Sequence, residues 1–80
     1  MMMVDVRRYR KGLALLAERV QVLLGDGYHV LFQFKSDDLA MVSLRHHNGN
    51  RITLKFTTND YTITQQTNHI ITHRETVRES

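Results

Sequence analysis

The histidines are the side chains of this sequence best suited to holding a metal, and five of them occur without any cysteine. His46 and His47 are neighbours, while His69 and His73 lie four residues apart, so two pairs could in principle approach one ion. Neither pair has a carboxylate at a recognisable ligand spacing. We therefore expect turn and edge histidines, and we predict no metal site and no cofactor.

Motifs that mark enzymes are missing from the sequence. It has no glycine-rich phosphate loop, no HExxH and no Gly-x-Ser-x-Gly. The predicted strand register brings Ser43 near His29, but no carboxylate lies on that face to orient the imidazole, so a catalytic triad has no third member. We predict a protein without catalytic activity.

Basic residues in the strand-like part of the chain have no acidic neighbours. Its first four runs contain no Asp or Glu, and their cations are predicted to share the outer face of a sheet: Lys35, Arg45, Arg51 and Lys55. The register places four residues in one row across the strands: His29, Arg45, Arg51 and Gln66. Arg45 opposite Arg51 is a like-charge pair that costs stability unless an anion binds. A phosphate or carboxylate contact is therefore predicted; the alternative is that both side chains extend into water.

A second group of cations crowds the start of the predicted helix, at Arg7, Arg8, Arg10 and Lys11. The helix dipole disfavours an exposed cation there by roughly 0.3–1 kcal/mol each. Such an uncompensated mismatch can indicate a phosphate-binding surface. The competing interpretation is a solvated charge run, with Asp5 offsetting part of the repulsion.

Apolar residues on the predicted surface favour a protein contact. Leu31, Leu39 and Met41 are expected on the outer face beside the cations, which suits a partner with an acidic surface. Leu15 and Val22 are expected on the back of the helix, where a second subunit could bind. The predicted outer face carries no aromatic residue, so nucleic acid would be held mainly through its phosphates.

The elements that position these residues follow from hydrophobic periodicity. Four runs alternate apolar and polar residues as half-buried strands do, and a fifth is weaker: residues 28–35, 39–46, 51–57, 61–66 and 70–77. Before them, one apolar stripe recurs at spacings of three and four: Val6, Tyr9, Leu13, Leu16, Val20 and Leu23. Asp5 is the predicted N-cap and Gly25 the residue just past the helix end.

These patterns predict an α+β fold, with an N-terminal helix (about 5–24) packed on one face of a four- to five-stranded antiparallel β-meander (about 28–77). A partly closed barrel and a dimer joined at its sheet edges are the alternatives.

Turn chemistry sets the predicted register. A three-residue loop ending at Gly49 places Leu44 opposite Ile52 and keeps both apolar sets on one face. A loop at 36–38 would likewise pair Phe32 with Val42, with Tyr28, Val30 and Phe34 facing inward too. A turn at 58–59 would pair Phe56 with Tyr61 and Leu54 with Ile63.

Length and composition bound the remaining questions. Eighty residues make a single domain, 1–80, and so small a core favours oligomerisation. Without cysteine there is no disulfide framework. Glu18 and Arg19 interrupt the one stretch that resembles a signal peptide, and no run is long enough to cross a membrane, so we expect a cytoplasmic protein.

The function predicted first is a non-catalytic binding module, a homodimer acting through protein–protein contacts. The alternative is a nucleic-acid-binding protein that contacts phosphates through the basic sheet face and the basic helix start. The net charge of +3 is compatible with either an acidic protein partner or a nucleic-acid backbone.

Overall fold

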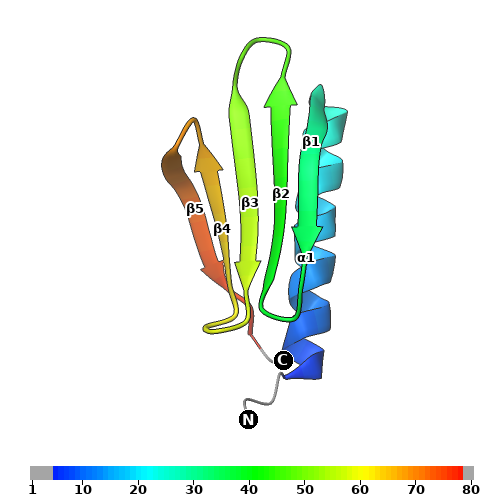
Figure 1. Cartoon of the computed structure of the whole chain (residues 1–80), viewed down its shortest axis with the longest axis vertical. Helices are drawn as coiled ribbons and strands as arrows, with labels where there is room; N and C mark the ends of the chain where they lie inside the picture. Colours follow the sequence, from blue (N-terminus) through cyan, green and yellow to red (C-terminus); the bar gives the residue numbers. More distant parts are fainter. Residues whose placement is uncertain (1–4, 79–80) are drawn as a thin grey trace.

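The computed structural model describes residues 5–78, and it contains one helix and one sheet (Figure 1). The elements follow one another in chain order: α1 (Val6–Gly25), β1 (Tyr28–Lys35), β2 (Leu39–His46), β3 (Arg51–Thr57), β4 (Thr62–Thr67) and β5 (Ile70–Thr76). Each strand pairs antiparallel with the next, in the order β1-β2-β3-β4-β5. The α+β meander is confirmed, the fifth strand forms, and the sheet does not close into a barrel.

Helix α1 begins and ends close to the expected positions. The Asp5 side chain accepts hydrogen bonds from the amides of Arg7 and Arg8, at 3.1 and 3.3 Å. The helix includes Gly25 and is capped by Asp26, one residue later than predicted. Gly12, which no pattern in the sequence singles out, lies against the Phe56 ring so closely that a Cβ there would overlap it. The absent side chain therefore lets α1 approach β3.

The core lies between α1 and the central strands. Within residues 5–78, ten apolar residues are buried: Leu16, Leu23, Ala40, Val42, Leu44, Ile52, Leu54, Phe56, Ile63 and Val77. The predicted β2–β3 register is confirmed, with Leu44 opposite Ile52. Gly49 has a φ of 99°, the left-handed conformation that this loop requires. The inward parity of β2 and β3 therefore holds throughout.

The predicted β1–β2 register is wrong in the second half of β1. Phe32 lies opposite Ser43 and not Val42, because the register shifts between Val30 and Phe32, where Leu31 is the extra residue of a bulge. The turn explains the shift. The Ser36 amide donates to the Leu39 carbonyl at 2.7 Å and the Ser36 hydroxyl accepts from the Leu39 amide at 3.2 Å, which closes the loop with Lys35 opposite Ala40.

This shift exchanges the two faces in the second half of β1. Phe32 and Phe34 were expected in the core but lie on the face opposite the helix. Gln33 and Lys35 were expected on the outer face but lie on the helix side, opposite the buried residues Val42 and Ala40. Val30, before the bulge, keeps its predicted side.

The predicted β3–β4 pairing is also wrong, but by two residues. Phe56 lies opposite Ile63 and Leu54 opposite Gln65, because Tyr61 has a φ of 52° and belongs to the turn. A shift of two preserves the face, so Ile63 remains in the core. Gln66 consequently lies opposite Thr53 and drops out of the predicted row with Arg51.

One helix cannot cover the whole inner face. A helix is about 10 Å wide, whereas five strands at about 4.8 Å spacing span roughly twice that. Figure 1 shows α1 running along the β1 side of the sheet. Even so, every residue of β1 after Tyr28 is exposed.

Candidate nucleic-acid interface

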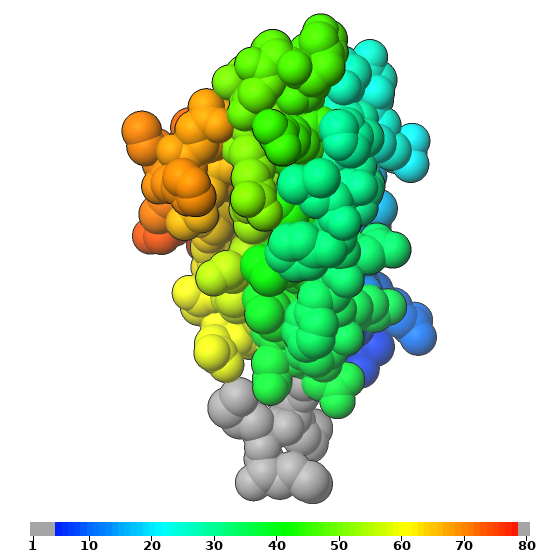
Figure 2. Space-filling view, turned by 45° about the horizontal axis from the view of Figure 1, so that its top comes forward, coloured from blue at the N-terminus to red at the C-terminus, as the bar shows by residue number. Residues whose placement is uncertain are grey.

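Among residues 5–78, no helix covers the face of the sheet opposite α1, which is termed the open face. In Figure 2, side chains of β1 line one margin of the surface formed by the strands. Four rows of paired residues cross this face; the row nearest the β3–β4 turn contains Leu39, Thr57, Thr62 and Thr76, and the other three follow. The first of these three contains Phe34, Met41, Lys55, Thr64 and Arg74; the second Phe32, Ser43, Thr53, Gln66 and Ile71; the third His29, Arg45 and Arg51.

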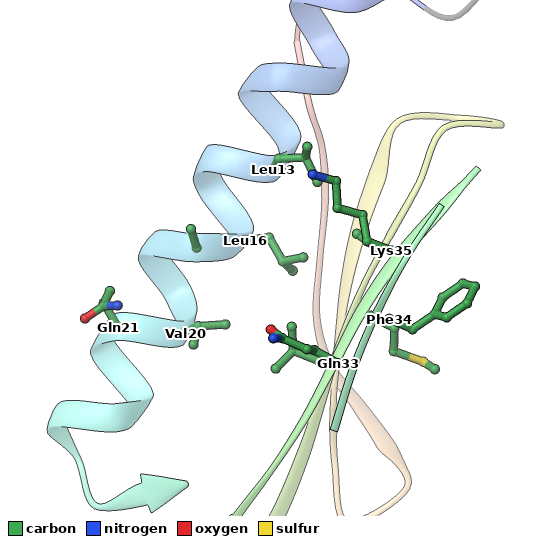
Figure 3. A pocket seen from close by; sticks show the side chains of 11 residues that line it. Leu13, Leu16, Val20, Gln21, Gln33, Phe34 and Lys35 are labelled. Atoms are coloured by element: carbon green, nitrogen blue, oxygen red, sulfur yellow. The ribbon is translucent and has the colours of Figure 1, made fainter. Parts of the chain in front are cut away.

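Two aromatic side chains stand exposed on the open face, contrary to the sequence-based expectation. Phe32 is 44% exposed and Phe34 is 51% exposed. Figure 3 shows Phe34 pointing away from α1, while Gln33 and Lys35 point toward it. Aromatic rings on an open sheet are the groups on which proteins stack unpaired bases. The corrected register thus supplies the stacking groups that the predicted face lacked.

The like-charge pair of Arg45 and Arg51 is confirmed: the two residues lie opposite each other on β2 and β3. The Arg51 Nε donates to the hydroxyl of buried Ser43 at 3.2 Å, and the Arg51 amide donates to the Asn68 side chain at 2.9 Å. Arg51 is therefore held in place, with part of its guanidinium available to a ligand.

Negative charge is absent from the open face of the described strands. Glu75 is the single acid within β1–β5, and it lies opposite Ile63 on the helix side. There it forms an ion pair with Arg19 at 3.9 Å. The cations of the open face therefore have no carboxylate beside them: Arg45, Arg51, Lys55 and Arg74.

A shallow hollow of about 130 Å³ lies on the open face over β3, β4 and β5. Its lining combines two cations with hydroxyl and amide groups: Thr53, Lys55, Thr64, Gln66, Ile71 and Arg74. Arg74 was not among the predicted site residues. The weak alternation of β5 concealed it, since a bulge at Thr72 changes which residues share a face.

The remaining predicted anion contacts are divided between the two sides of the sheet. His29 lies on the open face, whereas Lys35 lies on the helix side. Arg7, Arg8, Arg10 and Lys11 belong to α1. The Arg8 Nε donates to the Val77 carbonyl at 3.1 Å, and its guanidinium lies 4.1 Å from the Tyr61 ring centre. Arg8 thus helps to hold the fold, and one phosphate track joining both cation groups is not supported.

The predicted protein-contact residues are also spread over the molecule. Leu31 is exposed at the bulge, and Leu39 and Met41 are half-buried. Val22 is 60% exposed on α1. Leu15, expected on the back of the helix, is partly buried against the core.

The histidines are not gathered into a ligand set. Within residues 5–78, no three side chains of the metal-binding types are positioned around one point. The ring of His46 bridges two turns, accepting from the Asn48 amide at Nδ1 (3.1 Å) and lying 3.1 Å from the Asp26 carbonyl at Nε2. Because Nδ1 accepts, we assign the proton to Nε2.

In the described part of the chain, α1 lacks the length of apolar sequence that a membrane-spanning helix needs. Comparison with known proteins gives no relative: no family model, no curated protein and no solved structure matches this chain. The site must therefore be interpreted from its own geometry.

Proposed function

We propose that this protein binds single-stranded nucleic acid on the open face, without catalysing a reaction on it. The observation that carries the proposal is the exposure of Phe32 and Phe34 on a sheet face whose described strands carry four cations and no carboxylate. Stacking holds bases and the cations hold phosphates, so one surface satisfies both parts of the ligand. A cytoplasmic location belongs to the same proposal.

The arrangement of the rows favours a nucleic-acid strand that runs across the β-strands, from β1 toward β5. Phe34 stands at the β1 end of one row, Lys55 at its centre and Arg74 at the β5 end. If one base of an oligonucleotide stacks on Phe34, its sugar–phosphate backbone would run over Lys55 and the hollow beside it. Duplex DNA presents no unstacked base to these rings, and we therefore expect it to bind more weakly.

The test is fluorescence anisotropy with a labelled oligouridine or oligothymidine at two salt concentrations. Phe34→Leu keeps an apolar side chain but removes the ring, and we expect it to weaken binding by about 1 kcal/mol or more at either salt. Lys55→Ala should lower the slope of log affinity against log salt by about 0.7, the value for one single-strand phosphate.

Arg10→Ala is the matched control for charge, because Arg10 is an exposed cation of α1 on the other side of the sheet. It should leave the affinity nearly unchanged. The proposal fails if no oligonucleotide binds at low salt, or if Phe34→Leu and Arg10→Ala behave alike.

A protein partner with an acidic surface is the second candidate, favoured by the apolar residues Leu31 and Met41 beside the same cations. Such a partner would tolerate Phe34→Leu, because leucine still buries apolar area. Retained binding of an acidic protein by this variant, without any oligonucleotide binding, would select this second candidate.

A further inference from the structure

An apolar groove of about 560 Å³ separates α1 from the end of β1 (Figure 3). Its helix wall is mostly apolar and consists of Leu13, Leu16, Ala17, Val20 and Gln21. Its sheet wall includes Gln33, Lys35, Ala40 and Val42. Within residues 5–78, the side chains of Gln33 and Lys35 form no hydrogen bond or ion pair. The groove is thus an unfilled space between the helix layer and the sheet layer at the β1 edge.

The side of α1 that borders this groove has the pattern of a helix-packing surface. Leu13, Ala17, Val20 and Leu24 recur at spacings of four, three and four, which places them in one line along the helix. Ala17 is exposed and Leu24 is 39% exposed. Leu13 and Val20 also pack against the core beside the line through Gly12, Leu16 and Leu23, so Ala17 and Leu24 are the members of the stripe that remain exposed.

Strand β1 has an unpaired edge and apolar side chains on both faces. Val30, Leu31, Phe32 and Phe34 are each 40–51% exposed. As an edge strand, β1 also presents unpaired backbone amides and carbonyls. A groove, a helix stripe and a strand edge therefore adjoin one another along one side of the molecule.

We propose that this side is the interface of a homodimer, in which β1 pairs antiparallel with β1 of a second copy and the two α1 stripes pack together. The pairing is centred between Leu31 and Phe32, so that Val30 lies opposite Gln33 and Tyr28 opposite Lys35 of the second copy. This interface differs from a contact through Leu15 and Val22, and it does not depend on the proposed function.

Because of the bulge, the residues that this register places opposite each other point to the same face of the sheet. Antiparallel partners must point to the same side. Tyr28, Val30, Gln33 and Lys35 all lie on the helix side, and the proposed register pairs these four only with one another. His29 would lie opposite Phe34, both on the open face. No cation faces another cation in this arrangement, so like charges do not oppose the pairing.

The position of the groove supports a second copy of this chain as the molecule that covers it. The groove lies at the Gln33–Lys35 end of β1, and antiparallel pairing brings the Tyr28–Val30 end of the other copy to that position. Val30, which is 40% exposed, would then lie at a groove whose helix wall is mostly apolar, while Tyr28 stays packed against the core of its own copy. A bulge weakens edge pairing by itself, so the helix stripes supply the second half of the contact.

The first test is sedimentation velocity between about 1 and 100 µM, the range in which weak dimers dissociate. Ala17→Glu places a charge in the stripe, whereas Ala14→Glu makes the same change at an exposed position outside the groove. We expect Ala17→Glu to raise the dimer Kd at least tenfold and Ala14→Glu to leave it unchanged. A monomer throughout the range, or equal effects of the two variants, would overturn the proposal.

The second test uses disulfide formation and does not depend on a destabilising substitution, because the chain has no cysteine of its own. Val30→Cys with Gln33→Cys should give a covalent dimer under mild oxidation, since these positions face each other across the proposed pairing. Within one strand they are about 10 Å apart, too far to bond. Val30→Cys with Lys35→Cys is the control and should remain monomeric under denaturing conditions. A control that cross-links equally fast would show that the register, and hence the interface, is wrong.

Discussion

The contacts between α1 and the sheet differ on the two sides of the helix. On the β5 side, polar contacts join the helix to the sheet: Arg19 pairs with Glu75, and the Arg8 Nε donates to the Val77 carbonyl. On the β1 side, α1 and the strand enclose an apolar groove, into which Lys35 points without a partner in residues 5–78.

This difference shows that the β5 edge of the sheet is better covered than the β1 edge. The chain beyond β5 returns to the core, since Val77 is buried and its amide donates to the Tyr61 carbonyl at 2.7 Å. Both edge strands carry a bulge. In β5, the residues after Ile70 and Ile71 are polar or charged, and such residues discourage pairing with a further strand. β1 has polar residues toward its end, at Gln33 and Lys35, whereas its central stretch of Val30, Leu31 and Phe32 is apolar and exposed.

The largest expected effect is a loss of stability when the contact between Gly12 of α1 and Phe56 of β3 is disturbed. Alanine favours a helix over glycine by about 1 kcal/mol, so Gly25→Ala, which meets no atom within 4 Å, should be neutral or stabilising. Gly12→Ala should instead lower the free energy of unfolding by about 2 kcal/mol or more, because its Cβ would overlap Phe56. Urea denaturation measures both, and equal effects would contradict the close approach of α1 to β3.

A smaller effect should distinguish the cations on the two sides. Arg8→Met removes the hydrogen bond to Val77 and the contact with the Tyr61 ring, and should cost about 1–2 kcal/mol. Lys35→Met removes a cation without such contacts and should change monomer stability by less than about 0.5 kcal/mol. Thermal denaturation at low protein concentration compares them. Equal losses would mean that the β1 side is as well anchored as the β5 side.

The smallest effect concerns the β3–β4 turn, and it depends on pH. The Thr57 hydroxyl, which donates to Asp60 at 2.8 Å, is the main cause that lowers the pKa of Asp60 from its ordinary value of 3.8, followed by Thr62. Because the folded-state pKa is the lower one, ionised Asp60 stabilises the fold above pH 3.8, and this contribution is lost as the pH falls through the folded pKa.

Thr57→Ala should therefore lower the melting temperature slightly at neutral pH and match the parent chain in strong acid. Thr57→Ser keeps a hydroxyl and serves as the control. A difference between Thr57→Ala and the parent that persists unchanged in acid would exclude Asp60 as its source.

The sequence was sufficient to predict the architecture, because helix and strand periodicities differ and each apolar set needs one buried face. It also predicted the β2–β3 register, where Gly49 and its loop leave one pairing that buries Leu44 with Ile52. The like-charge pair of Arg45 and Arg51 followed from that register alone.

The candidate site was only half predictable, because a bulge leaves no mark on apolar alternation. Val30, Phe32 and Phe34 resemble one inward set, yet the loop closed by Ser36 displaces the second half of the strand. The aromatic rings of the open face and the cation of the groove both result from that displacement. A contact between Gly12 and Phe56 is likewise invisible to periodicity, since glycine adds nothing to an apolar stripe.

The packing of Gly12 on Phe56 also has a consequence for biosynthesis. Phe56 follows Gly12 by 44 residues, so at roughly 5–20 residues per second the ribosome makes the helix about 2–9 s before its docking surface. During that interval the nascent apolar stripe has no sheet to cover it and is a target for chaperones. The meander can form hairpin by hairpin as it emerges, and docking of the helix is then the late step of folding during translation.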